Sequence, residues 1–355
     1  MPAAHASSPA TAPVPVDPVA DPRWEDLVRR ASEGSIFHHP AWLRLLSESY
    51  GYPLSACCVA SADGRLLGGL PVALVSSRLT GRRLVALPFS DLCPPLAAPG
   101  APPSADGALG DALGALQRSC GLPLEVRGGG EILRRASRGQ RFHHHVLELD
   151  RDVDATKRRF TKPQALRGVR RALREGLRAE LRTDRGALAV FYRLHVATRR
   201  RLGVPTQPQR FILGLEQLFD EGLGFVLLVR REEHVVASAV FLTFGSVLTY
   251  KYGASDARSL AARPNNLLFM EAIRWGCENG FRSLDFGRTH WGQEGLRAFK
   301  LSWGPEERTL CYRNLGPTSG RAWDARVERA VAAAIRRAPP MAGRLIGEAL
   351  YRHAG

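Results

Sequence analysis

The sequence predicts a mixed α/β (α+β) protein with two similar domains, each a mostly antiparallel sheet flanked by helices. A length of 355 residues exceeds what one ordinary core needs and suits two domains of roughly 150 residues each. Apolar residues make up 45% of the chain and charged residues 24%, a composition typical of globular proteins. The order of helix-like and strand-like segments in the first half also recurs in the second. We therefore expect a disordered tail (1–20), a first domain (21–150), a second domain (151–320), and C-terminal helices (321–355) that pack back on the first domain.

The first half predicts two helices, a hairpin and further strands. Residues 1–19 contain mostly Ala, Pro, Ser and Thr, which cannot offset the entropy of ordering, so a disordered tail is predicted. Helical spacing begins at Trp24, and a second helix is predicted over 40–50 with a proline in its first turn. Strands are predicted at 56–60, 66–75, 84–87, 124–126 and 145–149, with a helix at 111–118.

The second half repeats this order. Its predicted helices lie at 163–181, 188–202 and 209–221, and its strands at 225–230, 235–244 and 247–252. A crossover helix at 265–279, a strand at 283–286, a short helix at 295–299 and a strand at 308–312 follow. The segments 322–337 and 341–352 are predicted to be amphipathic basic helices. Instead of packing on the first domain, they could lie on an anionic membrane surface through Leu345, Ile346 and Leu350.

Charge and cysteine content limit the classes of function. The net charge of +16 arises mainly from arginine and favours a polyanionic partner such as nucleic acid, nucleotide phosphate or an anionic membrane. Arginine-rich usage without a functional meaning is the alternative. The six cysteines form no CxxC pair and no zinc spacing, so no metal site is predicted. Because the sequence shows no leader pattern and no apolar run of about 18 residues, we expect a cytoplasmic protein, with peripheral contact at the inner membrane face as the alternative.

The most informative segment is 284–304, which contains LDFGR and then GLRAFKLSWG. A buried strand ends at a glycine turn, which lets backbone approach a ligand and places Arg288 at the end of the strand. Farther along, Lys300 stands beside Phe299. This order resembles the D-F-G-R … G-L-x-x-F-K-x-x-W-G signature of the FemABX-like and BioF2-like acetyltransferase families, which are relatives of the peptidoglycan-bridge aminoacyltransferases.

Four other segments carry the same resemblance: FHHPAWLRLL (37–46), LPFSDLCPP (87–95), RRALREGL (170–177) and TYKYGASD (249–256). The similarity extends over most of 35–315. It implies two tandem GNAT-like domains, with a C-terminal segment that returns to the first. It also implies transfer of an acyl or aminoacyl group from an activated donor to an amine by direct attack, with no bound cofactor.

The resemblance also implies roles for individual residues. Lys300 matches the family lysine beside the donor, where it would stabilise the oxyanion or the donor phosphates; a solvated surface lysine is the alternative. Asp285 could act as a base, orient Arg288, or make a structural hydrogen bond. Asp91, in the first-domain loop, is a second candidate base or part of a simple turn.

Two further elements are expected near the donor. Alternation on the strand at 249–252 predicts that Tyr250 and Tyr252 share one face and Lys251 the other, so either tyrosine could contact the donor or pack in the core. GNAT enzymes that use acetyl-CoA hold its pyrophosphate with a glycine-rich turn before the crossover helix. Here the turn reads LAARPNN (260–266) without glycine, which argues against plain acetyl-CoA. Arg263 could still bind a phosphate together with Asn265, or Asn265 could be an N-cap.

A basic segment at 157–185 predicts an arginine stripe on one helix. Its members are Arg167, Arg171, Arg174 and Arg178, beside an apolar face of Leu166, Val169, Leu173 and Leu177. We assign Arg171 and Arg174 to substrate binding. The stripe suits tRNA phosphates, a lipid-linked sugar pyrophosphate or a phosphopantetheine carrier, with a solvated face as the alternative.

Three functions therefore compete. The first is an N-acyltransferase that uses acyl-CoA or an acyl carrier thioester. The second is an aminoacyl-tRNA-dependent transferase that extends a peptidoglycan precursor. The third is a non-catalytic nucleic-acid-binding protein, which net charge alone would support but no helix-turn-helix, RRM or zinc-finger pattern does. The histidines at 38–39 and 143–145 lack metal spacing and are predicted to be structural.

Overall fold

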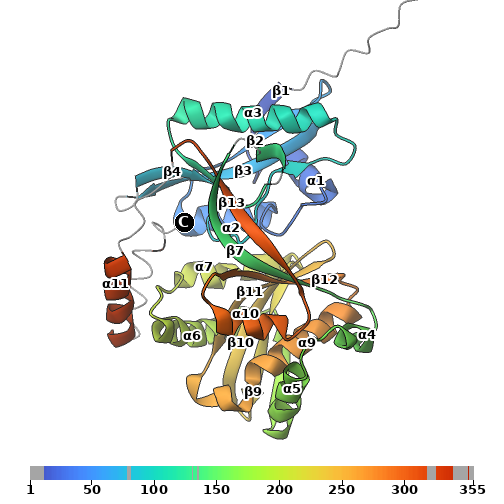
Figure 1. The fold of residues 1–355 in the computed structure, drawn as a ribbon, viewed down its shortest axis with the longest axis vertical. Coiled ribbons are helices and arrows are strands. Elements are labelled where there is room, and N and C mark those ends of the chain that lie inside the picture. The colour runs from blue at the N-terminus through green and yellow to red at the C-terminus, as the bar shows by residue number, and fades with distance from the viewer. Residues whose placement is uncertain are drawn as a thin grey trace, which may run out of the picture. The chain divides into compact units, whose positions relative to one another are not determined.

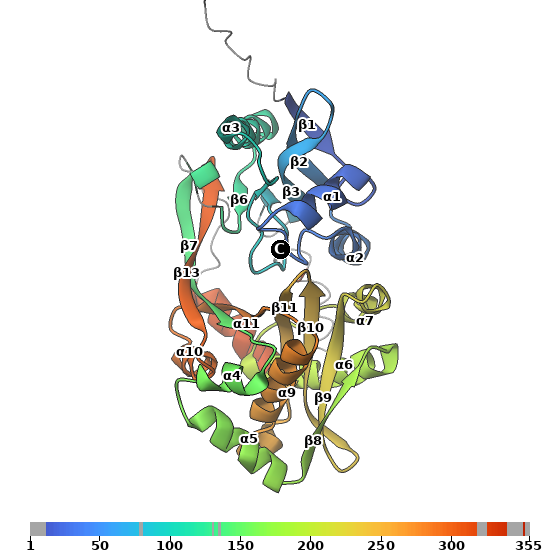
Figure 2. The same cartoon turned by 90° about the vertical axis from the view of Figure 1, so that its right-hand side faces the viewer.

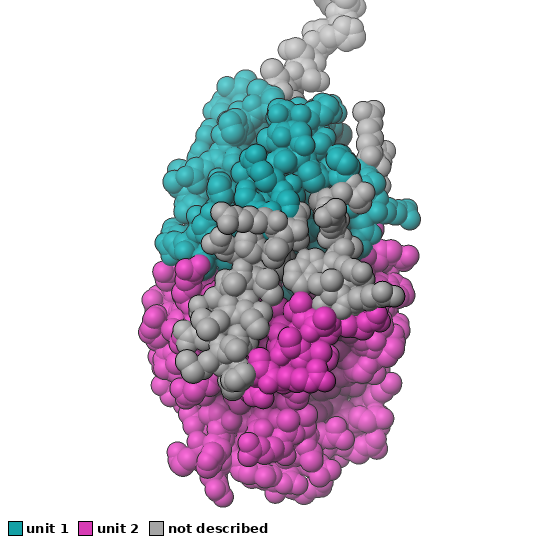
Figure 3. Space-filling view, turned by 90° about the vertical axis from the view of Figure 1, so that its left-hand side faces the viewer, with its two compact units in different colours: residues 1–140, 312–320, 355 teal, residues 141–311, 321–354 magenta. Residues whose placement is uncertain are grey.

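The computed structural model describes residues 12–77, 81–129, 131–133, 136–317, 325–338 and 351 (Figure 1). They form two compact units, coloured separately in Figure 3. The first unit contains the described residues up to 140 and those of 312–317, and the second contains 141–311, 325–338 and 351. The first unit therefore ends ten residues before the predicted domain boundary at 150, and the segment at 312–317 returns to it.

The first unit contains two short helices, a meander and a longer helix. Its elements are β1 (Ala12–Val16), α1 (Pro22–Arg30), α2 (Pro40–Tyr50), β2 (Leu54–Ala60), β3 (Leu66–Ser77), β4 (Gly81–Val85), β5 (Leu96–Ala97), α3 (Pro103–Cys120), β6 (Leu124–Val126), η1 (Glu131–Leu133) and the start of β7 (Ser137–Glu148). Local sequence sets the bounds of α2, because His39 caps its N-terminus, Pro40 occupies its first turn and Gly51 ends it in the left-handed conformation.

The predicted disordered tail is wrong for its described part. Ala12–Val16 forms β1, which pairs antiparallel with β2 from Ala12 opposite Ala60 to Val16 opposite Ala56. Backbone hydrogen bonds and burial of Val16 compensate for the low content of large apolar side chains here.

The second unit follows the element order expected of a GNAT domain. Its elements are the end of β7, α4 (Val153–Arg158), α5 (Gln164–Arg174), β8 (Leu177–Arg182), α6 (Arg185–Leu202), α7 (Gln209–Gly214), α8 (Glu216–Asp220), β9 (Gly224–Arg231), β10 (His234–Phe244), β11 (Val247–Ser255), η2 (Ala257–Ala262), α9 (Pro264–Glu278), β12 (Ser283–His290), α10 (Glu294–Leu301), the start of β13 (Glu306–Leu315) and α11 (Ala325–Arg337).

One predicted helix is too long. We expected 163–181 to be helical, but α5 ends at Arg174 and β8 begins at Leu177. Gly176, between them, has a φ of 73°, which ends the helix in the left-handed region. Arg178 therefore lies on β8 and is not part of the arginine stripe of the helix.

The strands of the two units share one pairing pattern. In the first unit, β1, β2, β3 and β4 are antiparallel neighbours, β4 pairs parallel with β6, and β6 pairs antiparallel with β13. In the second, β8, β9, β10 and β11 are antiparallel, β11 pairs parallel with β12, and β12 pairs antiparallel with β7. In each unit the last of these strands comes from the other half of the sequence, because β7 (Ser137–Glu148) precedes most of the second unit in the sequence and β13 (Glu306–Leu315) follows most of it.

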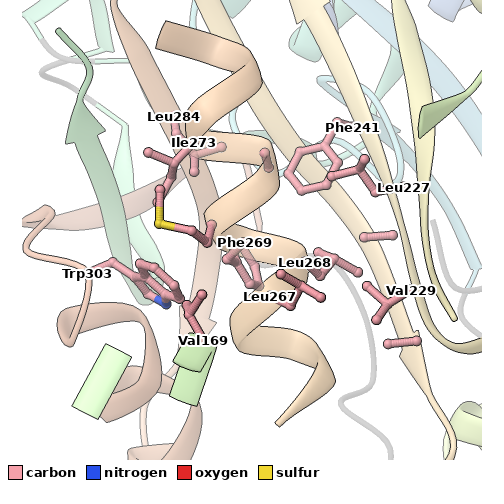
Figure 4. Close-up of a cluster of buried hydrophobic side chains, with 14 of the residues drawn as sticks. Val169, Leu227, Val229, Phe241, Leu267, Leu268, Phe269, Ile273, Leu284 and Trp303 are labelled. Atoms are coloured by element: carbon pink, nitrogen blue, oxygen red, sulfur yellow. The ribbon is translucent and has the colours of Figure 1, made fainter. Parts of the chain in front are cut away.

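In the second unit, helices cover both faces of the sheet (Figure 2). Helix α9 contacts β8 to β12 on one face and packs against α5, whereas α6 contacts β9, β10 and β11 on the other. Between α9 and the strands lies a buried apolar cluster that includes Phe241, Phe269, Leu284 and Trp303 (Figure 4). This core fixes the strand ends that carry the candidate site.

The C-terminal region packs differently from the prediction where it is described. Helix α11 contacts α6, an element of the second unit, whereas we expected the C-terminal helices on the first domain. The second predicted helix, at 341–352, lies outside the described residues except for Tyr351. Among the described residues, no helix is long and apolar enough to cross a membrane.

Candidate functional site

The candidate site lies where β11 and β12 diverge. These parallel strands pair over only three positions, of which Thr249 opposite Asp285 is the last. Beyond this point β11 continues beside β10, while β12 continues beside β7. Both strands are irregular here: β11 carries Lys251 as an extra residue opposite β10, and the pairing of β12 with β7 shifts between Asp285 and Arg288. Such bulges bend strands and redirect side chains.

Side chains hold the bend in β12 through the backbone of Gly287. The Asp285 Oδ1 atom accepts the Gly287 N–H at 2.7 Å, and Lys300 Nζ donates to the Gly287 carbonyl at 3.0 Å. Lys300 Nζ also donates to the Arg288 carbonyl at 3.2 Å. Gly287 has a φ of 67°, a conformation that favours glycine. Thus the glycine of the sequence motif lies at a bend in β12, and its backbone N–H and carbonyl both form hydrogen bonds with side chains.

The structure contradicts one of the two alternatives for Lys300. Its side chain is only 2% exposed, so it is not a solvated surface lysine. Its ammonium bonds to strand carbonyls, and the residue is absent from the lining of the basic cavity described below. The observed contacts give Lys300 a role in fixing β12.

Asp285 contacts a histidine that sequence reasoning assigned to structure alone. His144 Nε2, on β7, lies 2.9 Å from Asp285 Oδ1, and the two side chains are 10% and 15% exposed. Arg288, opposite His144 in the strand pairing, places its guanidinium 4.5 Å from the centre of the Phe142 ring. The structure therefore brings Asp285, Arg288 and Lys300 together and adds His144 to them.

A basic cavity of about 580 Å³ lies between α5, the start of α9, and α10. Its lining contains no acidic residue among those that the structure describes. The cationic lining residues are Lys162, Arg167, Arg171, Arg174 and Arg263. Among the described residues, only Arg171 of these five lies within 4 Å of a carboxylate, that of Glu175 at 3.8 Å. Unbalanced positive charge in a concave site favours an anionic ligand.

The arginine stripe of α5 faces this cavity, but the buried face of the helix differs from the prediction. The buried residues are Ala165, Gly168, Val169 and Ala172, whereas Leu173 is 56% exposed. Close packing of α5 against α9 requires small side chains: a Cβ on Gly168 would lie 2.4 Å from the Asn266 side chain. That side chain lines the cavity and donates from Nδ2 to the Ala165 carbonyl at 3.3 Å.

Helix α9 begins at the cavity without the glycine-rich turn. Arg263, which lines the cavity, is the N-cap residue in the left-handed conformation (φ 62°), and Pro264 occupies the first turn. The alternative that Asn265 is the N-cap is therefore wrong, because Asn265 lies within the helix and Asn266 lines the cavity instead. Backbone N–H groups at a helix start suit an anion, and αL strain outside glycine is often found at functional sites.

The other lining residues were missed in the sequence. They are Lys162, Gln164, Gly168, Asn266, Gly295, Ala298 and Ser302, whereas Arg167 belongs to the predicted arginine stripe. Phe299, which was predicted, also lines the cavity. A helical signal was present, since Gln164, Arg167, Arg171 and Arg174 recur at three- and four-residue spacing, and Gly295, Ala298, Phe299 and Ser302 do so on α10.

Tyr250 and Tyr252 do not share a face. The extra residue Lys251 in β11 interrupts the alternation, so Tyr250 packs against Phe241 and Phe269, while Tyr252 packs against His195 of α6. Burial raises the pKa of Tyr250 to about 12. The two tyrosines thus belong to opposite faces of the sheet, and Lys251 lies beside Tyr252, with its ammonium 5.2 Å from the ring centre.

The neighbouring histidines of β7 point to the other face. His145 Nε2 donates to Glu307 at 2.9 Å, and His143 Nδ1 lies 3.5 Å from the same carboxyl group. Arg297 donates twice to Glu307 at 2.7 Å, which is the main reason why the pKa of Glu307 falls to about 2. Burial is the main cause of the lowered pKa of His145. These contacts join α10 to β13 and β7.

Asp91 belongs to the first unit. Its backbone carbonyl accepts a hydrogen bond from the Tyr312 hydroxyl at 2.9 Å. Among the described residues, no group of three or more His, Cys, Asp or Glu side chains could hold a metal ion.

Comparisons with known proteins agree with this architecture. A family model described as an acetyltransferase (GNAT) domain matches residues 158–301. No curated protein matches the sequence. Similar solved structures include FemX, at 15% identity and a TM-score of 0.59, covering 84% of this chain and 96% of that one. The C-terminal domain of a putative lysylphosphatidylglycerol synthetase from Agrobacterium fabrum has 14% identity and a TM-score of 0.53, covering 88% and 95%.

A tandem GNAT protein from the clavulanic acid biosynthesis pathway has 15% identity and a TM-score of 0.52, covering 87% of this chain and all of that one. At these identities the structural likeness concerns the fold, whereas the family model identifies the domain that contains the basic cavity and the diverging strands. Residues 158–301 therefore form a GNAT acetyltransferase domain, which supports N-acyltransferase activity, and the chain shares the fold of FemX and of the tandem GNAT protein.

Proposed function

We propose that the protein transfers an acyl group from a phosphate-bearing thioester, acyl-CoA or a carrier-bound phosphopantetheine thioester, to an amine. The main support is the cavity with five cations at the start of α9. Arginine binds phosphate through two parallel hydrogen bonds, and helix N–H groups add partial positive charge. In place of a glycine-rich turn, arginine side chains would bind the donor phosphates. Arg263 lies at the start of α9, and Arg171 and Arg174 line the same cavity from α5.

In this proposal the donor phosphates bind in the cavity and the thioester extends toward the point where β11 and β12 diverge. The amine attacks the carbonyl carbon, a C–N bond forms, and the C–S bond breaks with release of a thiol. Because the thioester is already activated, the reaction requires no covalent enzyme intermediate. Positioning of the two substrates supplies much of the rate enhancement.

An aminoacyl-tRNA donor is the second candidate, and the arginines of α5 favour it. Arg167, Arg171 and Arg174 are exposed along one helix, where they could bind a polynucleotide backbone as well as a diphosphate. This candidate would connect the chain to amino-acid transfer onto a peptidoglycan precursor, as the FemABX resemblance implies. A non-catalytic nucleic-acid-binding protein would account for the charge but not for the GNAT domain.

The test offers the protein a set of donors with a mixture of amine acceptors. The donors are acetyl-CoA, long-chain acyl-CoA, an acylated carrier protein and radiolabelled aminoacyl-tRNA, and product formation is followed by mass spectrometry or by label transfer. Transfer from a thioester supports the proposal, transfer from tRNA alone supports the second candidate, and transfer from none of them contradicts both.

A matched pair of charge reversals then tests the cavity. Arg171→Glu should raise the donor KM about 10- to 100-fold, because a lost charge-assisted hydrogen bond costs about 1.5–3 kcal/mol. Arg178→Glu is the control, since Arg178 is also exposed but lies on β8 outside the cavity. Equal effects of the two variants would show that net charge, and not the cavity, governs donor binding.

A further inference from the structure

His144 and Asp285 form a hydrogen-bonded pair at the inner end of the diverging strands. Asp285 is the last residue of β12 that pairs with β11, so its carboxylate lies where the two strands separate. His144 Nε2 lies 2.9 Å from Asp285 Oδ1, and both side chains are largely buried. A histidine oriented by a carboxylate is the arrangement that generates a directed base in many acyl transfer enzymes.

The face of the sheet on which this pair lies differs from that of the basic cavity. On β7, His145 bonds to Glu307, and Leu147 lies in the core beneath α9, so alternation directs His144 to the opposite face. The cavity, by contrast, is lined by α5, α9 and α10. A donor whose phosphates bind in the cavity would pass its thioester between the diverging strands to the other face of the sheet. The thioester carbonyl would then lie on the face that carries His144.

The Asp285 contact fixes the tautomer of His144. An aspartate carboxylate only accepts hydrogen bonds, so His144 Nε2 carries the proton and donates it to Asp285 Oδ1. In the neutral ring Nδ1 is then the proton acceptor. Asp285 also accepts the N–H of Gly287 through the same oxygen, which ties the orientation of the histidine to the bend in β12.

We propose that His144 is the general base of the transfer and that Asp285 is its positioning residue. This inference rests on the proposed function. As the amine nitrogen attacks the thioester carbon, its proton moves to His144 Nδ1, and the imidazolium is stabilised by the Asp285 carboxylate. The tetrahedral intermediate collapses with cleavage of the C–S bond. The proton of His144 then passes to the thiolate, which restores the neutral histidine and releases a thiol.

The charged groups around the pair influence the pH at which His144 ionises. Arg288 faces His144 in the strand pairing, and Lys300 from α10 bonds to the Gly287 and Arg288 carbonyls behind the bend. Both cations disfavour a protonated His144, whereas Asp285 favours it. Removal of the Asp285 charge should therefore move the ionisation of His144 to lower pH.

The kinetic test uses the donor that the wild-type protein accepts. His144→Gln should lower kcat about 10²- to 10⁴-fold, the usual contribution of general base catalysis, with the donor KM changed by less than about twofold. Asp285→Asn keeps an oxygen for both hydrogen bonds but removes the charge, so the acid limb of the kcat–pH profile should shift down by about 1–3 pH units. The matched control is His145→Gln, next on the same strand but on the other face, which should retain kcat.

A second measurement tests the pair without catalysis. In ¹⁵N-histidine-labelled full-length protein at pH 7, the His144 resonances should show a protonated Nε2 and an unprotonated Nδ1. The opposite tautomer would overturn the proposal. An active enzyme whose kcat and acid limb are unchanged by His144→Gln would also overturn the proposal. A wild-type protein that uses no donor would contradict the proposed function instead. In that case the NMR spectrum still tests the predicted tautomer of His144.

Discussion

Replacement of Lys300 by methionine separates the role seen in the structure from the role that the sequence motif suggested. Methionine fills nearly the same buried volume but removes the ammonium and its bonds to the Gly287 and Arg288 carbonyls. Two charge-assisted hydrogen bonds are worth about 3–6 kcal/mol together, and release of the desolvation cost of a buried ammonium offsets part of that loss. We expect a net destabilisation of about 2 kcal/mol, which corresponds to a fall in Tm of about 4–8 °C for a unit of this size.

Thermal unfolding and donor kinetics measured together provide the assay. Because Lys300 lies outside the lining of the basic cavity, the donor KM should change little, while kcat should fall as the bend in β12 loosens. Lys157→Met is the control, since Lys157 is a half-exposed lysine in a surface ion pair with Asp154, worth less than about 1 kcal/mol. An unchanged Tm with a raised donor KM would refute this reasoning and restore direct contact between Lys300 and the donor.

Two further predictions concern packing and pH. Gly168→Ala should displace the Asn266 amide, because its Cβ would lie 2.4 Å from that side chain. It should destabilise the protein by about 1–3 kcal/mol and weaken donor binding. The thermal-shift control is Gly107→Ala in α3, where no atom lies within 4 Å of the new Cβ. The pKa of Glu307 is lowered from 4.5 to about 2, so its stabilising effect is present above pH 4.5 and is lost as the pH falls toward 2. The Tm of wild type should therefore fall over that window more steeply than the Tm of Glu307→Gln.

Much of the fold could be predicted because local signals agree with it. Helix α2 matches its predicted range of 40–50, since a cap, a proline and a glycine mark both ends. The family resemblance supplied the tandem arrangement, and the strands of the two units repeat one pairing pattern. The errors have physical causes: Gly176 ended α5 seven residues before the predicted end of the helix, and backbone pairing ordered β1 despite its composition.

The candidate site was harder to predict because bulges do not appear in a periodic pattern. Strict alternation along β11 would put Tyr250 and Tyr252 together, but the extra residue Lys251 sends them to opposite faces. The pair of His144 and Asp285 joins residues 141 positions apart, and their contact depends on the antiparallel pairing of β7 with β12. A run of three histidines gives no indication of which member will face which side until this pairing is known.

The different surroundings of Phe299 and Lys300 follow from helical spacing, which the sequence motif does not show. The motif places Phe299 and Lys300 side by side, which suggests that both meet the donor. On a helix, however, successive residues differ by about 100°, so neighbours in the sequence face different surroundings. Gly295, Ala298, Phe299 and Ser302 recur at helical spacing and line the cavity, while Lys300 turns toward β12. In the proposed donor complex the cations come from another element, because arginines recur on α5 at three- and four-residue spacing and line the cavity.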